Sequence, residues 1–303
     1  MSIKVTSKEM VQELLDNYDN FLFDCDGVIW LDTTLLPKVL ETLDMLRALG
    51  KRLIFVTNNS TKTRDEFVAK FASFGLKINR EDVFGSSYAS AIFAKDILKL
   101  PQDQKIWIVG DKGLEKEFKE AGYKTIGGTK MPELDEPLDL KNKDDPIYHL
   151  DPQVGAAVVG MDTKINYHRL AVTLQYLLKP NVVYIATNID STYPANGMVL
   201  PGEGTLVQAA AYCSQKKPYS CGKPSKSLID VIVKTHGIDK NRSIMIGDNL
   251  NTDMKFGLDN GLETMLVMTG IGSEEALNAL EETKQPTYFA DKLGDLYELM
   301  ESR

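Results

Sequence analysis

The sequence has few cysteines, few histidines and no long hydrophobic run, and these shortages exclude several classes of protein. Its three cysteines, Cys25, Cys213 and Cys221, are odd in number and lack C-x-x-C spacing, so we expect neither a disulfide framework nor a zinc site. No apolar run approaches the roughly 18 residues of a membrane span, and residues 1–5 lack the apolar core of a signal peptide. The sequence therefore predicts a cytoplasmic protein with reduced cysteines.

Positive charge is also scarce, because the chain carries a formal net charge of −8 at pH 7. This surplus of acidic residues argues against broad binding to nucleic acid or to an anionic membrane, so an anionic substrate needs a local positive site. The composition is otherwise that of an ordinary globular protein, with 43% apolar and 26% charged residues. A length of 303 residues is enough for about two domains.

The stretch that directs the interpretation is residues 21–27, in which Phe-Leu-Phe leads to two acids, Asp24 and Asp26, and then to a glycine. A short apolar run is typical of a buried strand in a parallel sheet, and open α/β folds build their sites at the carboxyl ends of such strands. Side chains two residues apart on a strand point the same way, so we expect the two carboxylates to meet unless the chain already leaves the strand at Asp26. Mg²⁺ between them would relieve their repulsion, although aspartates that only form a turn also fit the pattern.

Further polar residues follow other predicted strands or lie in short loops. Together with the first pair, the candidates for one site are Asp24, Asp26, Thr57, Asn58, Asn59, Lys223, Asp248 and Asp253. Phosphoryl transfer needs a nucleophile, an acid or base, donors for the phosphate oxygens and cations, and this set supplies each part. Simpler readings stay open: a polar loop after the second strand, a solvated lysine in the Gly-Lys-Pro turn, and aspartates that cap a helix.

Four motifs occur in a fixed order that covers both ends of the chain: D-x-D-G-V from Asp24, T-N-N from Thr57, G-K-P around Lys223 and G-D-x-x-x-T-D around Asp248. With these motifs the sequence resembles the haloacid dehalogenase superfamily of Mg²⁺-dependent phosphatases, in the branch with a large α/β cap between the second and third motifs. Within that branch it is similar to the fungal para-nitrophenyl phosphatases and the phosphoglycolate phosphatases. The resemblance runs nearly end to end.

The resemblance implies the catalytic roles. Asp24 resembles the nucleophile that forms an aspartyl-phosphate, and Asp26 resembles the general acid and base. The carboxylates of Asp24 and Asp248, with the backbone carbonyl of Asp26, resemble the protein ligands of Mg²⁺. Asp253 resembles the acid outside the ligand set that orients the lysine or a metal-bound water.

The resemblance also implies the phosphate-binding groups. Thr57, with the backbone of Asn58 and Asn59, resembles the phosphate cradle. Lys223 resembles the lysine that neutralises charge during both binding and catalysis.

Substrate choice is expected to lie in a cap loop at residues 188–194, which we expect to close over the site. Tyr193 stands in this loop where the pyridoxal-phosphate branch carries a histidine. We therefore expect 2-phosphoglycolate and related short phospho-acids as substrates, together with para-nitrophenyl phosphate in vitro. Pyridoxal phosphate is the alternative.

The predicted fold is α/β, with a doubly wound, mostly parallel Rossmann-like core sheet and an inserted α/β cap. We assign residues 1–101 and 204–303 to the core and residues 102–203 to the cap. Strands are expected at 21–23, 53–56, 83–85, 106–109, 156–159, 182–186, 243–246 and 264–268. Helices are expected at 4–19, 37–49, 63–74, 88–100, 114–121, 167–178, from 205 onward, 276–280 and 295–300. Residues 129–151 are expected to form an exposed excursion.

Two readings from other classes compete with an enzyme: a phospho-receiver that does not turn over, and a catalytically silent scaffold. The inserted domain and the D-x-D pair oppose a receiver, and the intact motifs oppose a scaffold. We expect a small phosphate ester as the binding partner, neither nucleic acid nor membrane, and consider a homodimer formed through the cap.

Overall fold

The computed structural model describes residues 2–195 and 197–302, which divide into two units by their contacts. The divisions are Met1–Thr57, Arg64–Phe84 and Lys223–Arg303 for unit 1, and Asn58–Thr63 and Gly85–Gly222 for unit 2. These bounds differ from the predicted ones, because residues 85–101 and 204–222 group with unit 2. The proline-containing stretch near residue 101 therefore does not mark the change of unit. A cap role for unit 2 stays a prediction.

Unit 1 is built on a seven-stranded sheet with strand order β1-β16-β15-β14-β2-β5-β6. Its strands are β1 (Ile3–Lys4), β2 (Asn20–Phe23), β5 (Arg52–Thr57), β6 (Val83–Gly85), β14 (Ser243–Gly247), β15 (Glu263–Val267) and β16 (Tyr288–Ala290). The pairings from β1 through to β5 are all parallel, which confirms the predicted fold class. A short antiparallel hairpin, β3 (Trp30–Leu31) and β4 (Thr34–Leu35), follows β2.

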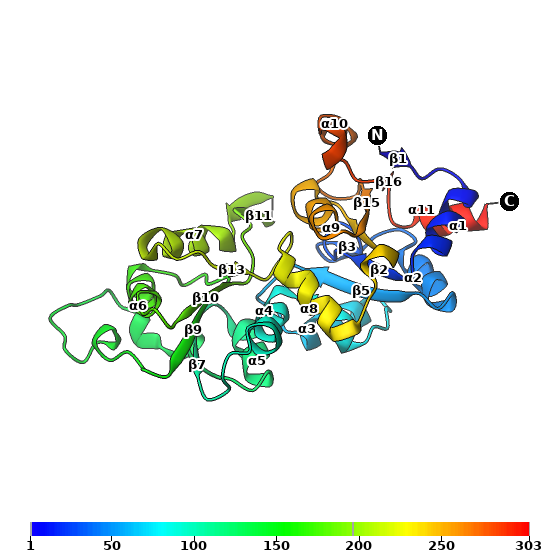
Figure 1. Cartoon of the computed structure of the whole chain (residues 1–303). Coiled ribbons are helices and arrows are strands. Elements are labelled where there is room, and N and C mark those ends of the chain that lie inside the picture. The colour runs from blue at the N-terminus through cyan, green and yellow to red at the C-terminus, as the bar shows by residue number, and fades with distance from the viewer. Residues whose placement is uncertain (1, 196, 303) are drawn as a thin grey trace. The chain divides into compact units, whose positions relative to one another are not determined.

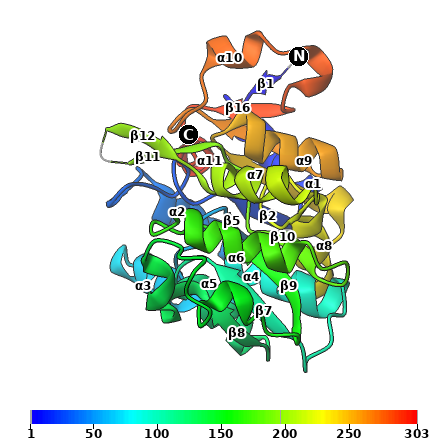
Figure 2. The ribbon, with the colours of Figure 1, turned by 90° about the vertical axis from the view of Figure 1, so that its left-hand side faces the viewer.

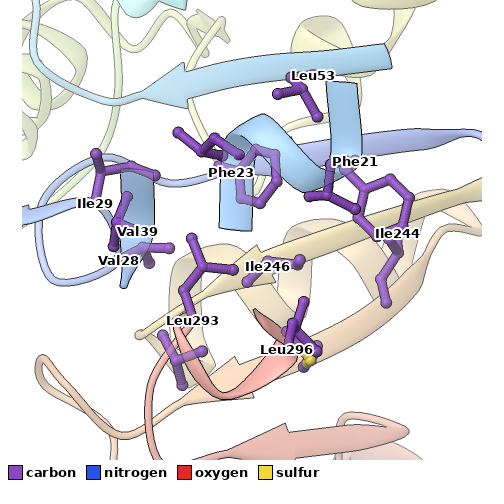
Figure 3. Packing of buried hydrophobic residues seen from close by; sticks show 14 of the residues in the cluster. Phe21, Phe23, Val28, Ile29, Val39, Leu53, Ile244, Ile246, Leu293 and Leu296 are labelled. Carbon is purple, nitrogen blue, oxygen red and sulfur yellow. The ribbon is translucent and has the colours of Figure 1, made fainter. Parts of the chain in front are cut away.

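The helices of unit 1 are α1 (Lys8–Asn17), α2 (Val39–Ala48), α3 (Arg64–Ser73), α8 (Lys226–His236), α9 (Lys255–Asn260), α10 (Glu274–Asn278) and α11 (Asp295–Glu301). The first and last helices, α1 and α11, pack against each other, so both ends of the described chain lie in this unit (Figure 1). Figure 3 shows why β2 is so apolar: Phe21 and Phe23 pack against Ile244 and Ile246 of β14 in the buried core. This burial favours a central strand, whose carboxyl end is then held rigidly.

Unit 2 has its own parallel sheet of five strands in the order β13-β10-β9-β7-β8. Its strands are β7 (Lys105–Val109), β8 (Lys124–Gly127), β9 (Val154–Val159), β10 (Val183–Ala186) and β13 (Tyr219–Ser220), and its helices are α4 (Ser86–Ile92), α5 (Lys112–Glu120), α6 (Tyr167–Leu177) and α7 (Glu203–Ser214). Figure 2 shows α6 and α7 side by side against this sheet. Contacts between α4 and α5, and pairing of β13 with β10, explain why the flanking segments belong to unit 2.

Two segments of unit 2 depart from the expected pattern. The excursion at 129–151 holds short 3₁₀ turns, but Leu134 and Asp145 within it are buried, so it is not wholly exposed. The expected loop at 188–194 is only partly a loop, because β11 (Thr192–Ala195) pairs antiparallel with β12 (Met198–Pro201). Among the residues that the structure describes, no helix has the length and apolarity to cross a membrane.

Candidate active site

The candidate site of unit 1 lies where three neighbouring strands end. Asp24 directly follows β2, Thr57 is the last residue of β5, and Asp248 directly follows β14. β2 lies between the other two strands, and the backbone N–H of Asp24 donates to the carbonyl of Ile246, 2.9 Å away. The chain continues from β2 to β5 on one side and returns to β14 on the other, and such a reversal of strand order is the usual place for a site in an open α/β sheet.

Three carboxylates gather at this edge. Asp24, Asp248 and Asp253 each offer one oxygen, and these oxygens lie within 4.8 Å of one another. Asp253 Oδ2 accepts the backbone N–H groups of Asp248 and Asn249, each at 3.1 Å, which closes the turn after β14. Asp248 Oδ2 accepts the N–H of Ile271 at 2.8 Å. The backbone therefore fixes the orientation of both acids.

Lys223 joins this cluster from the segment before α8. Its Nζ lies 2.6 Å from Asp24 Oδ1 and 2.7 Å from Asp253 Oδ1, and it donates to the carbonyl of Val56 at 3.1 Å. Burial by itself lowers the pKa of this ammonium, but the charges of Asp24 and Asp253 outweigh burial and raise the pKa above its usual value. With 3% of its side chain exposed, Lys223 is not a solvated surface lysine.

The charge balance of the cluster suits a divalent cation. Three carboxylates face one ammonium, which leaves a formal charge of −2 (three minus one) in a largely buried space. Burial, with the neighbouring charge of Asp253 as the next contribution, raises the pKa of Asp248 to about 6. A donor set made only of oxygen atoms is what Mg²⁺ prefers, and its charge would balance the site. The residues present therefore fit a magnesium ion.

Two glycines leave room for the Asp248 carboxylate. Gly27 has a φ of +86°, and a Cβ placed on it would collide with the Asp248 carboxylate. A Cβ on Gly270 would meet the same carboxylate. The glycine of the D-x-D-G motif is thus required both by its backbone conformation and by the acid beside it.

Asp26 is not part of the group of three carboxylates formed by Asp24, Asp248 and Asp253. The strand ends at Phe23, so the alternation of side chains no longer holds at Asp26. The Asp26 carboxylate is 60% exposed and accepts the indole N–H of Trp30 at 2.7 Å. Lys70 Nζ lies 3.8 Å from Asp26 Oδ1 and 4.0 Å from the centre of the Trp30 ring.

Trp30 and Lys70 were missed at the level of sequence. A tryptophan four residues after an aspartate does not by itself predict a hydrogen bond between them, because that bond depends on the conformation of the turn that separates the two residues. Lys70 comes from a separate helix, α3.

Asn58 and Asn59 open the short segment that belongs to unit 2. Asn58 Nδ2 donates to Asp190 Oδ2 at 2.9 Å, and Asn59 Oδ1 accepts from the N–H and the hydroxyl of Thr61. Both side chains are therefore engaged in holding the segment. A role of their backbone in phosphate binding stays a prediction.

Tyr193 lies in β11 and pairs with Leu200 of β12, and its side chain is half-buried. The hairpin begins shortly after Asp190, the residue whose carboxylate accepts the hydrogen bond from the Asn58 side chain. Recognition of substrate by Tyr193 stays a prediction.

Models of known families match both halves of the motif set. One described as haloacid dehalogenase-like hydrolase matches residues 21–124, and another, described as HAD-hydrolase-like, matches residues 220–296. All eight residues first grouped as candidates for one site lie within the two matched stretches.

Relatives match over nearly the whole chain. A 4-nitrophenylphosphatase of Schizosaccharomyces pombe is 37% identical over 98% of this chain and 99% of its own length. Phosphoglycolate phosphatase 1A, chloroplastic, of Arabidopsis thaliana is 39% identical over 95% of this chain and 78% of its own length. Glycerol-3-phosphate phosphatase of Mus musculus is 35% identical over 96% of this chain and 93% of its own length.

A solved structure matches the fold. The crystal structure of 4-nitrophenylphosphatase from Thermotoga maritima has a TM-score of 0.78 and 30% sequence identity, and the match covers 95% of this chain and 99% of that one. The similarity confirms the α/β architecture with a core sheet and a separate smaller sheet.

Proposed function

Because this chain belongs to the haloacid dehalogenase-like hydrolase family, we propose that it is a Mg²⁺-dependent phosphomonoesterase that works through an aspartyl-phosphate. It is a phosphatase of the 4-nitrophenylphosphatase and phosphoglycolate phosphatase type. The observation that carries the proposal is the contact of Lys223 with Asp24 inside a cluster of three carboxylates.

In this proposal Asp24 is the nucleophile. One of its carboxylate oxygens attacks phosphorus, the bond from phosphorus to the ester oxygen breaks, and Asp26 gives the departing oxygen a proton. Asp26 then takes a proton from water as the water attacks the aspartyl-phosphate, which releases phosphate and restores Asp24. Asp26 can exchange protons with solvent because its carboxylate is exposed.

The other residues bind phosphate and neutralise charge. Lys223 holds Asp24 in place and faces the negative charge of the phosphate. The Thr57 hydroxyl and the backbone N–H groups of Asn58 and Asn59 are proposed to donate to the remaining phosphate oxygens. Asp24, Asp248 and the backbone carbonyl of Asp26 would hold Mg²⁺, which supplies positive charge next to the phosphate when bound. Asp253 orients Lys223 from 2.7 Å.

We propose short phosphorylated acids, with 2-phosphoglycolate first, as substrates. This is supported by relatives that are named phosphoglycolate phosphatases and by the half-buried Tyr193 in the hairpin of unit 2. Pyridoxal phosphate is the second candidate. The relative named glycerol-3-phosphate phosphatase makes glycerol 3-phosphate a necessary member of any substrate panel.

A panel of phosphate esters tests this proposal. The kcat/KM of the wild-type chain is measured for para-nitrophenyl phosphate, 2-phosphoglycolate, glycerol 3-phosphate and pyridoxal phosphate, with Mg²⁺ and with a chelator. We expect Mg²⁺-dependent multiple turnover, with 2-phosphoglycolate the best of the natural esters. Asp24→Asn should abolish turnover and keep the fold, because an amide is a poor nucleophile. Release that stops at one phosphate per chain would instead favour a phospho-receiver.

A further inference from the structure

The segment that follows β5, residues 58–63, is fastened to unit 2 by several hydrogen bonds. The Asn58 carbonyl accepts from the Ser86 hydroxyl and from Asn188 Nδ2, each at 2.7 Å. The Ser87 hydroxyl donates to the carbonyl of Ser60 at 2.5 Å. This segment begins directly after Thr57. It contains the backbone of Asn58 and Asn59, so the conformation of the segment determines the position of the N–H groups that are proposed to bind phosphate.

A further buried contact of this segment is with Glu203, the first residue of α7. The Ser60 hydroxyl donates to Glu203 Oε1 and accepts the backbone N–H of Met161 at 3.2 Å. Glu203 is 5% exposed and Ser60 is 1% exposed, so water cannot replace this hydrogen bond easily. The backbone N–H groups of Met161 and Ser60 also face the carboxyl.

Charge around Glu203 is unfavourable for a carboxylate. Asp190 is the charged group that faces it, and no lysine or arginine among residues 2–195 and 197–302 forms an ion pair with it. Burial raises the pKa of the Glu203 carboxyl to about 8; the hydrogen bond from Ser60 opposes this effect, and the charge of Asp190 adds to it. The carboxyl is therefore mostly neutral at neutral pH.

We propose that Glu203 is a positioning residue for the phosphate-binding backbone: it holds Ser60, and through Ser60 it holds the backbone of Asn58 and Asn59 in the conformation that accepts substrate. The inference rests on the proposed function, in which that backbone binds phosphate. Ionisation of Glu203 places a buried negative charge near Asp190, and the cost of burying that charge favours movement of the carboxylate toward water. The segment loosens when this happens.

Kinetics with para-nitrophenyl phosphate test the role in substrate binding. Glu203→Ala should raise KM about tenfold at every pH and change kcat by less than about twofold, because one buried hydrogen bond is lost and the chemistry is untouched. Glu203→Gln keeps an oxygen that accepts from Ser60 and cannot ionise, so it should match the wild type near neutral pH. The KM of the wild type should rise above about pH 8, and that of Glu203→Gln should not.

Two further variants make the test specific. Ser60→Ala removes the same hydrogen bond from the other partner and should raise KM as Glu203→Ala does, and the double variant should be no worse than either single one. This variant also stands in if Glu203→Ala does not fold. Asp145→Asn changes another buried carboxylate of unit 2, whose partners are His168 and Ile147, and should leave KM unchanged.

Amide hydrogen exchange tests the positioning without any need for activity. Exchange of residues 58–63 should be about tenfold faster in Glu203→Ala than in the wild type near neutral pH, and unchanged in Glu203→Gln, while the amides of β9 keep their protection. An alkaline rise in KM that persists in Glu203→Gln, or unchanged exchange of residues 58–63 in Glu203→Ala, would overturn the inference. Absence of Mg²⁺-dependent turnover in the wild type would refute the proposed function, and the exchange measurement would still decide whether Glu203 holds the segment.

Discussion

Lys223 Nζ lies 2.6 Å from Asp24 Oδ1, although 199 residues of sequence separate the two. Both residues belong to unit 1, and the chain between them includes the whole of unit 2. The same ammonium lies 2.7 Å from Asp253, so one buried cation neutralises two acids from different segments of the chain. The ion pair is therefore both a structural link between distant parts of the sequence and the proposed charge partner of the phosphate.

Removal of this cation should destabilise the fold. Lys223→Met leaves Asp24 and Asp253 buried without their counter-charge, and we expect the free energy of unfolding to fall by about 3–5 kcal/mol, with loss of turnover. Urea unfolding measures this change. Lys226→Met is the matched control, because that side chain is 77% exposed and pairs with Asp230 on the surface, and it should cost less than about 0.5 kcal/mol. Equal midpoints for the two variants would contradict the role of Lys223.

Magnesium should stabilise the chain as well as activate it. Binding of Mg²⁺ to the folded state alone adds about 2.7 kcal/mol of stability when the ion is at about 100 times its Kd. We expect the melting temperature to rise with Mg²⁺ and to return when a chelator is added. Asp248→Asn should abolish this rise, whereas Asp259→Asn, on the exposed surface of α9, should keep it. A rise of the same size in Asp248→Asn would exclude that residue as a ligand.

The parts of the site that could be predicted from sequence are those that a strand end positions locally. The apolar runs of β2, β5 and β14 are buried in a parallel sheet, so the polar residues just after them had to meet at one edge. Asp26 shows the limit of this rule, because the chain leaves the strand before that residue and the period of two no longer applies.

Contacts between distant segments could not be predicted. Glu203 and Ser60 are 143 residues apart, and no pattern in either segment marks the other as its partner. The hairpin of β11 and β12 is a second case, because part of the loop expected at residues 188–194 pairs with Met198–Pro201 instead. The short edge strand β1 carries too few residues to show alternation.

Trp30 should position the proposed general acid. Trp30→Phe keeps a buried ring but removes the N–H that holds Asp26, so we expect kcat for 2-phosphoglycolate to fall about tenfold. The fall for para-nitrophenyl phosphate should be smaller, since its leaving group departs with less help from an acid. Trp107→Phe is the control, because it removes the indole hydrogen bond to Thr173 in unit 2. Equal losses for both esters in Trp30→Phe would indicate a packing defect instead.

Glu203 should also make stability depend on pH. Its carboxyl has a pKa of about 8 in the folded chain against 4.5 as the ordinary value, so the folded state keeps a proton that the unfolded state loses. The resulting stability is fully present below about pH 4.5 and is lost as pH rises to about 8. The free energy of unfolding of the wild type, measured relative to Glu203→Gln, should therefore fall by a few kcal/mol across this range and stay level above it. A difference that does not change with pH would show that the carboxyl is already ionised.

Tyr193 provides the test of substrate choice. It is half-buried in the β11–β12 hairpin, and its proposed role is to contact a small substrate. Tyr193→Ala should lower kcat/KM for 2-phosphoglycolate about tenfold, because a short acid depends on each contact with its carboxylate end. The value for para-nitrophenyl phosphate should change by less than about twofold, since an activated aryl ester needs little recognition. Tyr212→Ala, whose side chain is 83% exposed on α7, should affect neither ester. Equal effects of Tyr193→Ala on both esters would reduce Tyr193 to a packing residue of unit 2, and a wild-type preference for pyridoxal phosphate would assign the chain to the other substrate.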